Sequence, residues 1–137
     1  MYKKTITYTD YNGKKRTEDK YFNMTEPEAM KLQYSVAGGY AAKLEEIKKN
    51  EDQGAALDFL EDILSRSYGE KTEDGGFEKS EEIARKFKNS AAYPAIFMEL
   101  ATDTKAVEEF INATFPKPKN SQTGDDLVPI PKTKGKK

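Results

Sequence analysis

The chain has 137 residues, almost equal numbers of acidic and basic side chains, and a formal net charge of −1, a balance that argues against a dedicated nucleic-acid-binding protein. It contains no cysteine and no histidine, which excludes disulfides, thiolate metal sites and thiol or imidazole catalysis. No apolar run approaches the roughly 18 residues of a membrane helix, and the N-terminus lacks the apolar segment of a signal peptide.

The first predicted element is a β-hairpin within residues 1–24. One face of residues 2–9 carries the larger side chains Tyr2, Ile6 and Tyr8, and the other face carries threonines, which is typical of a half-buried strand. Asn12-Gly13 predicts a type I′ turn, because both residues tolerate a positive φ, and a second strand over about residues 15–23 returns. A lone hairpin is marginally stable in water, so we expect it to pack on helices or to pair with another chain.

Residues 25–116 are predicted to form a mainly α-helical region of five or six helices. Thr25 and Glu28 have the spacing of a capping box at the start of the first helix. Gly38-Gly39 interrupts the pattern, and a second helix over about residues 40–49 places Tyr40, Leu44 and Ile47 along one stripe.

Residues 55–67 carry the clearest helical pattern, with leucines at spacings of three and four. Gly69 is predicted to terminate this helix, and residues 70–76 to form a polar loop. Ser80, Pro94 and Asp103 then mark the starts of three more helices, and Pro116 ends the last. The residues that we expect to form the core are Leu57, Leu60, Leu64, Ile96, Phe97 and Phe110.

The C-terminal segment differs in composition from the rest of the chain. From Phe115 to Lys137 it holds four of the six prolines and six lysines against two aspartates, and its sizeable apolar residues are few. Such a segment buries too little surface to offset chain entropy. We therefore predict an α+β fold in which residues 1–116 form a single globular domain and residues 117–137 form a disordered Pro/Lys-rich tail.

Two kinds of segment have the composition of a chemical site. The pairs Glu81-Glu82 and Glu108-Glu109 are adjacent on predicted helices, so their side chains point about 100° apart and do not converge on one substrate atom. Asp10-Tyr11-Asn12-Gly13 and Glu73-Asp74-Gly75 lack the ligand spacing of a calcium loop and are typical of turns. We predict no enzyme activity, no cofactor and no metal, and the sequence does not identify which residues bind a partner.

The predicted hairpin is rich in basic residues interleaved with tyrosines. The basic residues are Lys3, Lys4, Lys14, Lys15, Arg16 and Lys20. A basic, aromatic β-surface can bind nucleic acid through phosphate contacts and stacking. Lysines also protect edge strands against aggregation, and Asp10, Glu18 and Asp19 dilute the positive charge. We therefore favour the protective role.

Four segments together resemble a known family. They are residues 3–13 (KKTITYTDYNG) with 16–24 (RTEDKYFNM), residues 67–77 (SYGEKTEDGGF), residues 79–83 (KSEEI), and residues 92–115 (AYPAIFMELATDTKAVEEFINATF). In this order and spacing the chain resembles the tail assembly chaperones of long-tailed, siphovirus-like phages of Gram-positive bacteria. Lys20 departs from the pattern, because an apolar or acidic residue is expected there. No functional residue of the family is carried over.

The resemblance implies a role in tail morphogenesis. Such chaperones coat the long, mostly helical tape-measure protein in the host cytoplasm before the tail tube polymerises, and they are absent from the mature virion. The major tail tube protein is a second candidate partner, and the hairpin edge offers a route to self-association. In many such phages a ribosomal frameshift makes a longer product, and Lys136-Lys137 is a candidate for the site of that shift.

Two alternatives stay open from the sequence. The first is a small phage or mobile-element protein that binds and inhibits a host protein. The second is a nucleic-acid-binding accessory protein, whose affinity would fall steeply with salt because phosphate contacts release counterions. Neighbouring tail genes would favour the chaperone.

Overall fold

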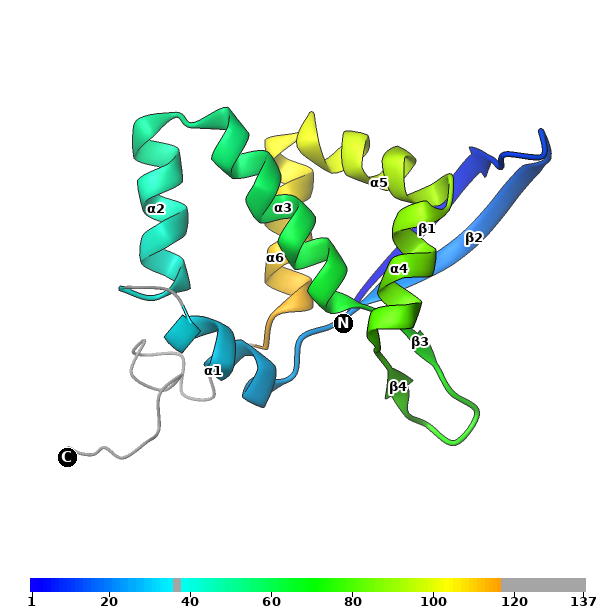
Figure 1. Cartoon of the computed structure of the whole chain (residues 1–137), viewed down its shortest axis with the longest axis horizontal. Helices are drawn as coiled ribbons and strands as arrows, with labels where there is room; N and C mark the ends of the chain where they lie inside the picture. Colours follow the sequence, from blue (N-terminus) through cyan, green and yellow to red (C-terminus); the bar gives the residue numbers. More distant parts are fainter. Residues whose placement is uncertain (36–37, 117–137) are drawn as a thin grey trace.

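The computed structural model describes residues 1–35 and 38–116 (Figure 1). The elements in chain order are β1 (Tyr2–Thr9), β2 (Lys15–Phe22), α1 (Glu26–Ser35), α2 (Tyr40–Asn50), α3 (Gln53–Ser67), β3 (Tyr68–Lys71), β4 (Phe77–Glu78), α4 (Glu81–Asn89), α5 (Ala92–Ala101) and α6 (Thr104–Thr114). The predicted α+β class, with an N-terminal hairpin followed by helices, is confirmed over these residues. The prediction of a disordered tail concerns residues 117–137, which lie outside the described part.

The strands form one antiparallel sheet in the order β1-β2-β3-β4. The N-terminal hairpin is therefore not a lone hairpin. Its second strand pairs with β3 through Tyr21 opposite Gly69 and Phe22 opposite Tyr68. In Figure 1 the turn between β1 and β2 projects away from the helices, while the other end of the pair lies beneath them.

The predicted end of the helix before Gly69 is confirmed, since α3 ends at Ser67, but Gly69 itself lies in β3. The predicted loop over residues 70–76 is confirmed for residues 72–76 and wrong for Glu70 and Lys71, which belong to β3. Helix α3 passes directly into β3, because Tyr68 already has an extended backbone with ψ 136°. Gly69 is needed for close packing instead: a Cβ there would lie 2.6 Å from Phe77 Cε2 and 2.8 Å from the carbonyl oxygen of Glu78. Residues 72–76 are the turn of a second hairpin.

Both hairpin turns use a single glycine with positive φ. In the first turn the backbone N–H of Gly13 donates to the Asp10 carbonyl (2.9 Å), and the N–H of Asp10 donates to the Lys14 carbonyl (2.8 Å). Gly13 has φ 83°, whereas Asn12 is not among the described residues with positive φ. The predicted type I′ turn is therefore wrong. The Asp10 carboxylate accepts from the N–H groups of Asn12 and Lys14, which favours a three-residue loop closed by a glycine bulge.

The core is built around Phe22, which is fully buried at the end of β2. Its ring centroid lies 5.5 Å from those of Tyr68 and Phe110 and 5.7 Å from that of Phe87. Tyr68 stacks on Phe87 at 4.0 Å. One residue of β2 thus joins the sheet to α4 and α6, and aromatic pairs of this kind add to the free energy gained by burial.

Most of the predicted core residues are buried, and one is not. Leu60, Leu64, Ile96 and Phe110 are confirmed in the core, and Phe97 packs against it while half-buried. The prediction that Leu57 belongs to the core is wrong, because 44% of this residue is exposed. The buried residues of α3 all lie from Leu60 onward, so the first turns of this helix extend beyond the central core.

Three of the predicted helix starts are confirmed by side-chain hydrogen bonds, whereas the helix predicted to start at Pro94 begins at Ala92 without a side-chain cap. The N–H of Thr25 donates to Glu28 Oε1 (2.9 Å), and the N–H of Glu28 donates to Thr25 Oγ1 (3.3 Å), which completes the capping box. Ser80 and Asp103 likewise accept bonds from the first turns of α4 and α6. These caps fix where each helix begins.

Lys79 connects the segment that joins β4 to α4 with the segment that joins β2 to α1. Its Nζ donates to the carbonyl oxygen of Asn23 (2.8 Å) and to Glu28 Oε1 (2.6 Å). Burial disfavours the charge on Glu28, but the bonds from Lys79 and from the N–H of Thr25 outweigh this effect and lower the pKa of Glu28. The N-terminal hairpin and the helices are therefore held in one arrangement.

Candidate partner-binding surface

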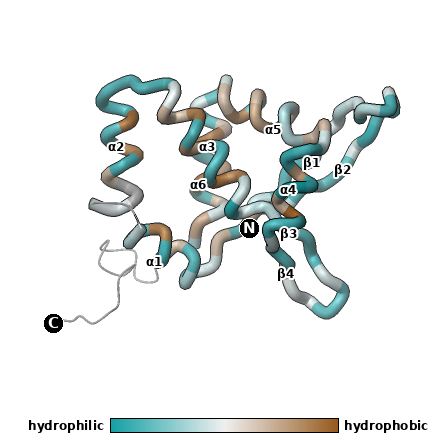
Figure 2. Tube along the Cα trace, viewed as in Figure 1, coloured by the Kyte–Doolittle hydropathy of each residue, from teal (hydrophilic) through white to brown (hydrophobic). Residues whose placement is uncertain are grey.

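Helix α5 is apolar around its whole circumference, with Glu99 as its one charged residue. Its inner face is formed by Ala92, Ile96 and Leu100, which are at most 1% exposed. The opposite side carries Pro94, Phe97, Met98 and Ala101, at positions i, i+3, i+4 and i+7. We call these four residues the outer α5 stripe. Figure 2 shows hydrophobic residues along α5, in contrast to the mainly hydrophilic α4.

The outer α5 stripe faces solvent. Met98 is 56% exposed, Pro94 and Ala101 are also exposed, and Phe97 is half-buried with its ring centroid 5.7 Å from that of Tyr93. Helix α5 packs on β1, α3, α4 and α6, its buried residues are Ala92, Ile96 and Leu100, and Phe97 lies at the border where the outer α5 stripe meets the core. A flexible methionine beside an aromatic ring on an exposed helix is typical of a surface that binds other proteins.

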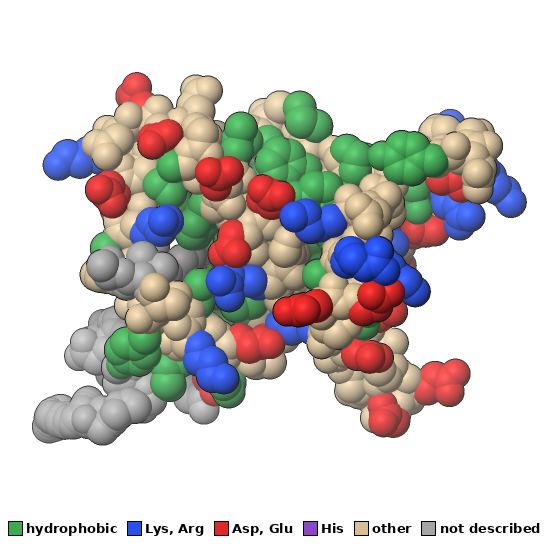
Figure 3. All heavy atoms as spheres, in the orientation of Figure 1, with side chains coloured by type: hydrophobic (Ala, Val, Ile, Leu, Met, Phe, Trp, Pro, Cys, Tyr) green, Lys and Arg blue, Asp and Glu red, His purple; other side chains and the backbone are tan. Residues whose placement is uncertain are grey.

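Leu57 is an exposed apolar residue of α3, a helix that packs on α5. One turn further along α3, Glu61 forms an ion pair with Lys88 (3.0 Å) and lies close enough to α5 to affect Tyr93. Burial and, to a smaller degree, the negative charge of Glu61 raise the pKa of Tyr93 to about 12. We define the α3–α5 face as the outer α5 stripe together with Leu57. Figure 3 shows hydrophobic side chains gathered along the upper edge of the molecule, over α5.

The sequence of α5 contains one feature that points to this face. The segment AYPAIFMELA has two apolar stripes at helical spacing, one for each side of the helix. A helix that is apolar all round is usually buried on every side, which is consistent with the prediction of Phe97 as a core residue. The second stripe at positions 94, 97, 98 and 101 indicates a second apolar surface, and the packing of the helix decides which of the two stripes is exposed.

The basic residues of the hairpin are partly neutralised. Within the described residues three of the six are in ion pairs: Lys4 with Glu99 (2.6 Å), Arg16 with Asp10 (2.6 Å) and Lys20 with Glu18 (3.1 Å). Lys20, the residue that departs from the family pattern, lies 5.9 Å above the ring of Tyr68. The inner face of β2 accommodates this lysine by pairing its charge. Strand β2 pairs with β3 only through Tyr21 and Phe22, so among the described residues the hairpin offers the outer edge of β1 and the edge of residues 15–20 of β2 without a partner strand.

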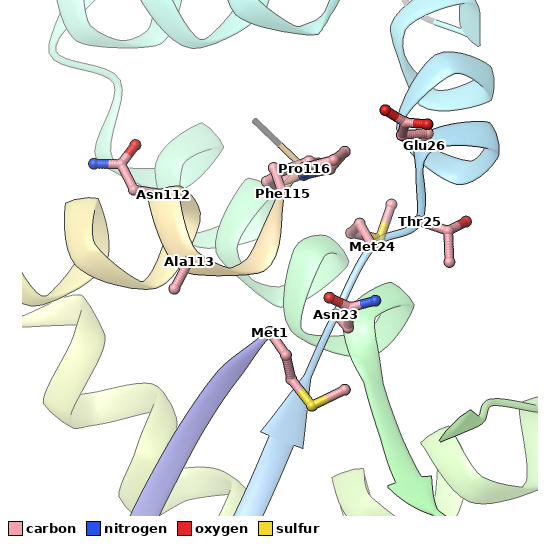
Figure 4. Close-up of a pocket in the computed structure, with 9 residues that line it drawn as sticks. All are labelled: Met1, Asn23, Met24, Thr25, Glu26, Asn112, Ala113, Phe115 and Pro116. Atoms are coloured by element: carbon pink, nitrogen blue, oxygen red, sulfur yellow. The ribbon is translucent and has the colours of Figure 1, made fainter. Parts of the chain in front are cut away.

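A pocket of about 510 Å³ lies between the N-terminus, the β2–α1 link and the end of α6 (Figure 4). Met24 lies beside Phe115 and Pro116 in its wall, which also contains polar side chains such as Asn23 and Asn112. Among the described residues that line it, Glu26 is the single charged one.

The carboxylate pairs considered from the sequence lie apart from one another. Glu81 and Glu82 are exposed in the first turn of α4, where Glu82 pairs with Arg85 (2.8 Å), and Glu108 and Glu109 are exposed on α6. Across residues 1–35 and 38–116 there is no group of three carboxylates placed to hold a metal ion. None of the helices in this part of the chain combines the length and apolar content of a membrane span.

Comparison with known proteins agrees with the resemblance found in the sequence. A family model described as phage tail assembly chaperone matches residues 1–126, which include every element described above. Neither the curated proteins nor the solved structures contain a match to this chain. Because the family model covers nearly the whole sequence, the chain belongs to the phage tail assembly chaperone family.

Proposed function

We propose that this protein binds the tape-measure protein of its phage and keeps it soluble until the tail tube assembles around it. It acts by binding and not by catalysis, in the host cytoplasm, and it is absent from the mature virion. The observation that carries the proposal is the α3–α5 face, where Met98 and Leu57 remain 56% and 44% exposed on a member of a chaperone family.

The physical basis is the aggregation of exposed apolar surface. A long helical protein that awaits assembly exposes apolar stripes, and such stripes associate with one another in water. A second protein with an apolar helical face covers a stripe through anchors at i, i+3, i+4 and i+7. The outer α5 stripe has this spacing, so it can pack against a client helix without any change in the fold.

Co-expression with the tape-measure protein tests this role. We expect the tape-measure protein to move from the insoluble to the soluble fraction and to co-purify with this chain. The major tail tube protein, expressed in the same way, shows whether the effect is specific to one client. If the tape-measure protein stays insoluble and no complex is recovered, while a host protein is bound instead, the role as an inhibitor of a host protein replaces this proposal.

Self-association would use a different part of the molecule. We propose that copies on one tape-measure protein contact one another through the free edge of β1, because an unpaired strand edge can pair with a second chain. Lys3 and Lys4 are the charged residues of that strand. They lie in its first half, so the threonines of the second half offer the less protected part of the edge.

A further inference from the structure

The inference concerns the chemistry of the client segment, and it rests on the proposed function. We propose that the α3–α5 face receives an amphipathic helix whose apolar stripe is flanked by lysine or arginine residues. The apolar part of this pairing follows from the outer α5 stripe and Leu57. The basic flanks follow from the charges of the helices that surround the face.

These helices carry a clear excess of negative charge. Segments 53–67 and 92–114, which contain α3, α5 and α6, hold seven acidic residues: Asp58, Glu61, Asp62, Glu99, Asp103, Glu108 and Glu109. They hold two basic residues, Arg66 and Lys105. Helix α4 also packs on α5 and α3 and adds two acidic and three basic residues, so the two segments and α4 together hold nine acidic residues against five basic ones. Lysines from other elements pair with Glu61 and Glu99, and the excess persists after these pairs are removed. Figure 3 shows both acidic and basic side chains below the apolar edge of the molecule.

Asp58 is the acidic residue best placed to act on a client. It is exposed on α3 directly after Leu57, and among the described residues it forms no ion pair. A lysine or arginine beside the apolar stripe of a client helix would meet this carboxylate at the border of the α3–α5 face.

The charge distribution also distinguishes a client from a second copy of this chain. Two copies that met through their α3–α5 faces would place Asp58 and its acidic neighbours against the same residues of the partner. Like charges brought together at an interface weaken the association. A helix with basic flanks has the complementary charge, so the face favours a client over self-association.

Two helical peptides of about 18 residues, or five turns, test the inference. Both carry leucines at i, i+3, i+4 and i+7 and one tryptophan; one has lysines beside the stripe and the other has glutamates. The protein contains no tryptophan, so the fluorescence reports on the peptide alone. We expect the lysine peptide to bind with a blue shift, and the glutamate peptide to bind at least about tenfold more weakly, because complementary charge decides between partners of equal apolar content.

Three variants locate the binding site. Met98→Gln removes an apolar contact without adding charge and is expected to weaken the lysine peptide by about tenfold or more. Asp58→Lys should weaken the lysine peptide and strengthen the glutamate peptide. Tyr34→Gln changes an equally exposed side chain on α1 (60% exposed) and should leave both affinities unchanged. A thermal melt of each variant verifies that it is folded.

The outcomes separate this inference from the proposed function. Equal affinity for the two peptides would overturn the proposal that the client has basic flanks. Unchanged affinity of Met98→Gln for the lysine peptide would overturn the proposal that the α3–α5 face is the binding site. Wild-type protein that binds neither peptide would overturn both parts. In each of these cases co-expression with the tape-measure protein still reports independently on the chaperone role.

Discussion

Replacing Phe22 by alanine is expected to lower the free energy of unfolding by about 3–5 kcal/mol. Phe22 is fully buried, and its ring contacts those of Tyr2, Tyr68, Phe87 and Phe110. The substitution removes these contacts and leaves a cavity where the sheet meets two helices. Because small domains are stabilised by only about 5–15 kcal/mol, the variant should unfold at a much lower urea concentration.

The matched control is Tyr11→Ala. Tyr11 is also aromatic but is 78% exposed at the turn between β1 and β2, so its loss should change the unfolding free energy by no more than about 0.5 kcal/mol. Urea denaturation followed by circular dichroism measures both variants. If Phe22→Ala cost as little as Tyr11→Ala, the hairpin would not be packed on the helices as described.

Replacing Gly69 by alanine should destabilise the protein by about 1–3 kcal/mol. An added Cβ would meet Phe77 Cε2 at 2.6 Å, Lys79 Cγ at 2.7 Å and the backbone oxygen of Glu78 at 2.8 Å. The two side chains can move, but the carbonyl oxygen belongs to the second hairpin. The pairing of β3 with β4 must therefore shift.

Gly54→Ala serves as the control for this substitution. Gly54 lies in the first turn of α3, where a Cβ would have only an ordinary contact at 3.7 Å with Asp52. Alanine has the higher helix propensity, so this variant should be neutral or more stable by up to about 1 kcal/mol. Thermal unfolding of the two variants gives opposite shifts if Gly69 is required for close packing. Shifts of the same sign and size would indicate that the loss of glycine alone determines stability.

Local signals in the sequence were sufficient to predict most of the elements. Thr25, Ser80 and Asp103 each form the cap that their side chain predicts, because capping depends on residues within one turn. The alternation of residues 2–9 predicted β1 because this pattern also depends only on residues that are close in the sequence. The helical boundaries followed from apolar spacing and from the positions of glycine and proline.

Two of the errors concern features that depend on residues distant in the sequence, and a third concerns hydrogen bonds within one turn. A glycine just after a helix is typical of a helix terminator. Gly69 lies in a strand because it pairs with Tyr21 of β2, while Tyr68 pairs with Phe22. The exposure of Leu57 depends on where the core ends, and the spacing within α3 does not contain that information. The turn after β1 was assigned to the wrong type because Asp10 accepts two backbone bonds within it.

The candidate binding surface was not predicted at all, and the reason is physical. The exposed stripe and the buried stripe of α5 are both apolar, so the sequence of this helix alone does not determine which side packs on the core. The structure separates them, since Ile96 is fully buried and Met98 is 56% exposed. The distinction requires the tertiary packing of α5 on β1, α3, α4 and α6.

The central claim is that the α3–α5 face contacts the tape-measure protein, and site-specific photo-crosslinking tests it most directly. A photoreactive amino acid at position 98 or at position 34 replaces an exposed side chain in each case, and each variant is co-expressed with the tape-measure protein and irradiated. We predict a crosslink to the tape-measure protein from position 98 and none from position 34. A complex that forms normally but crosslinks from position 34 and not from position 98 would contradict the account.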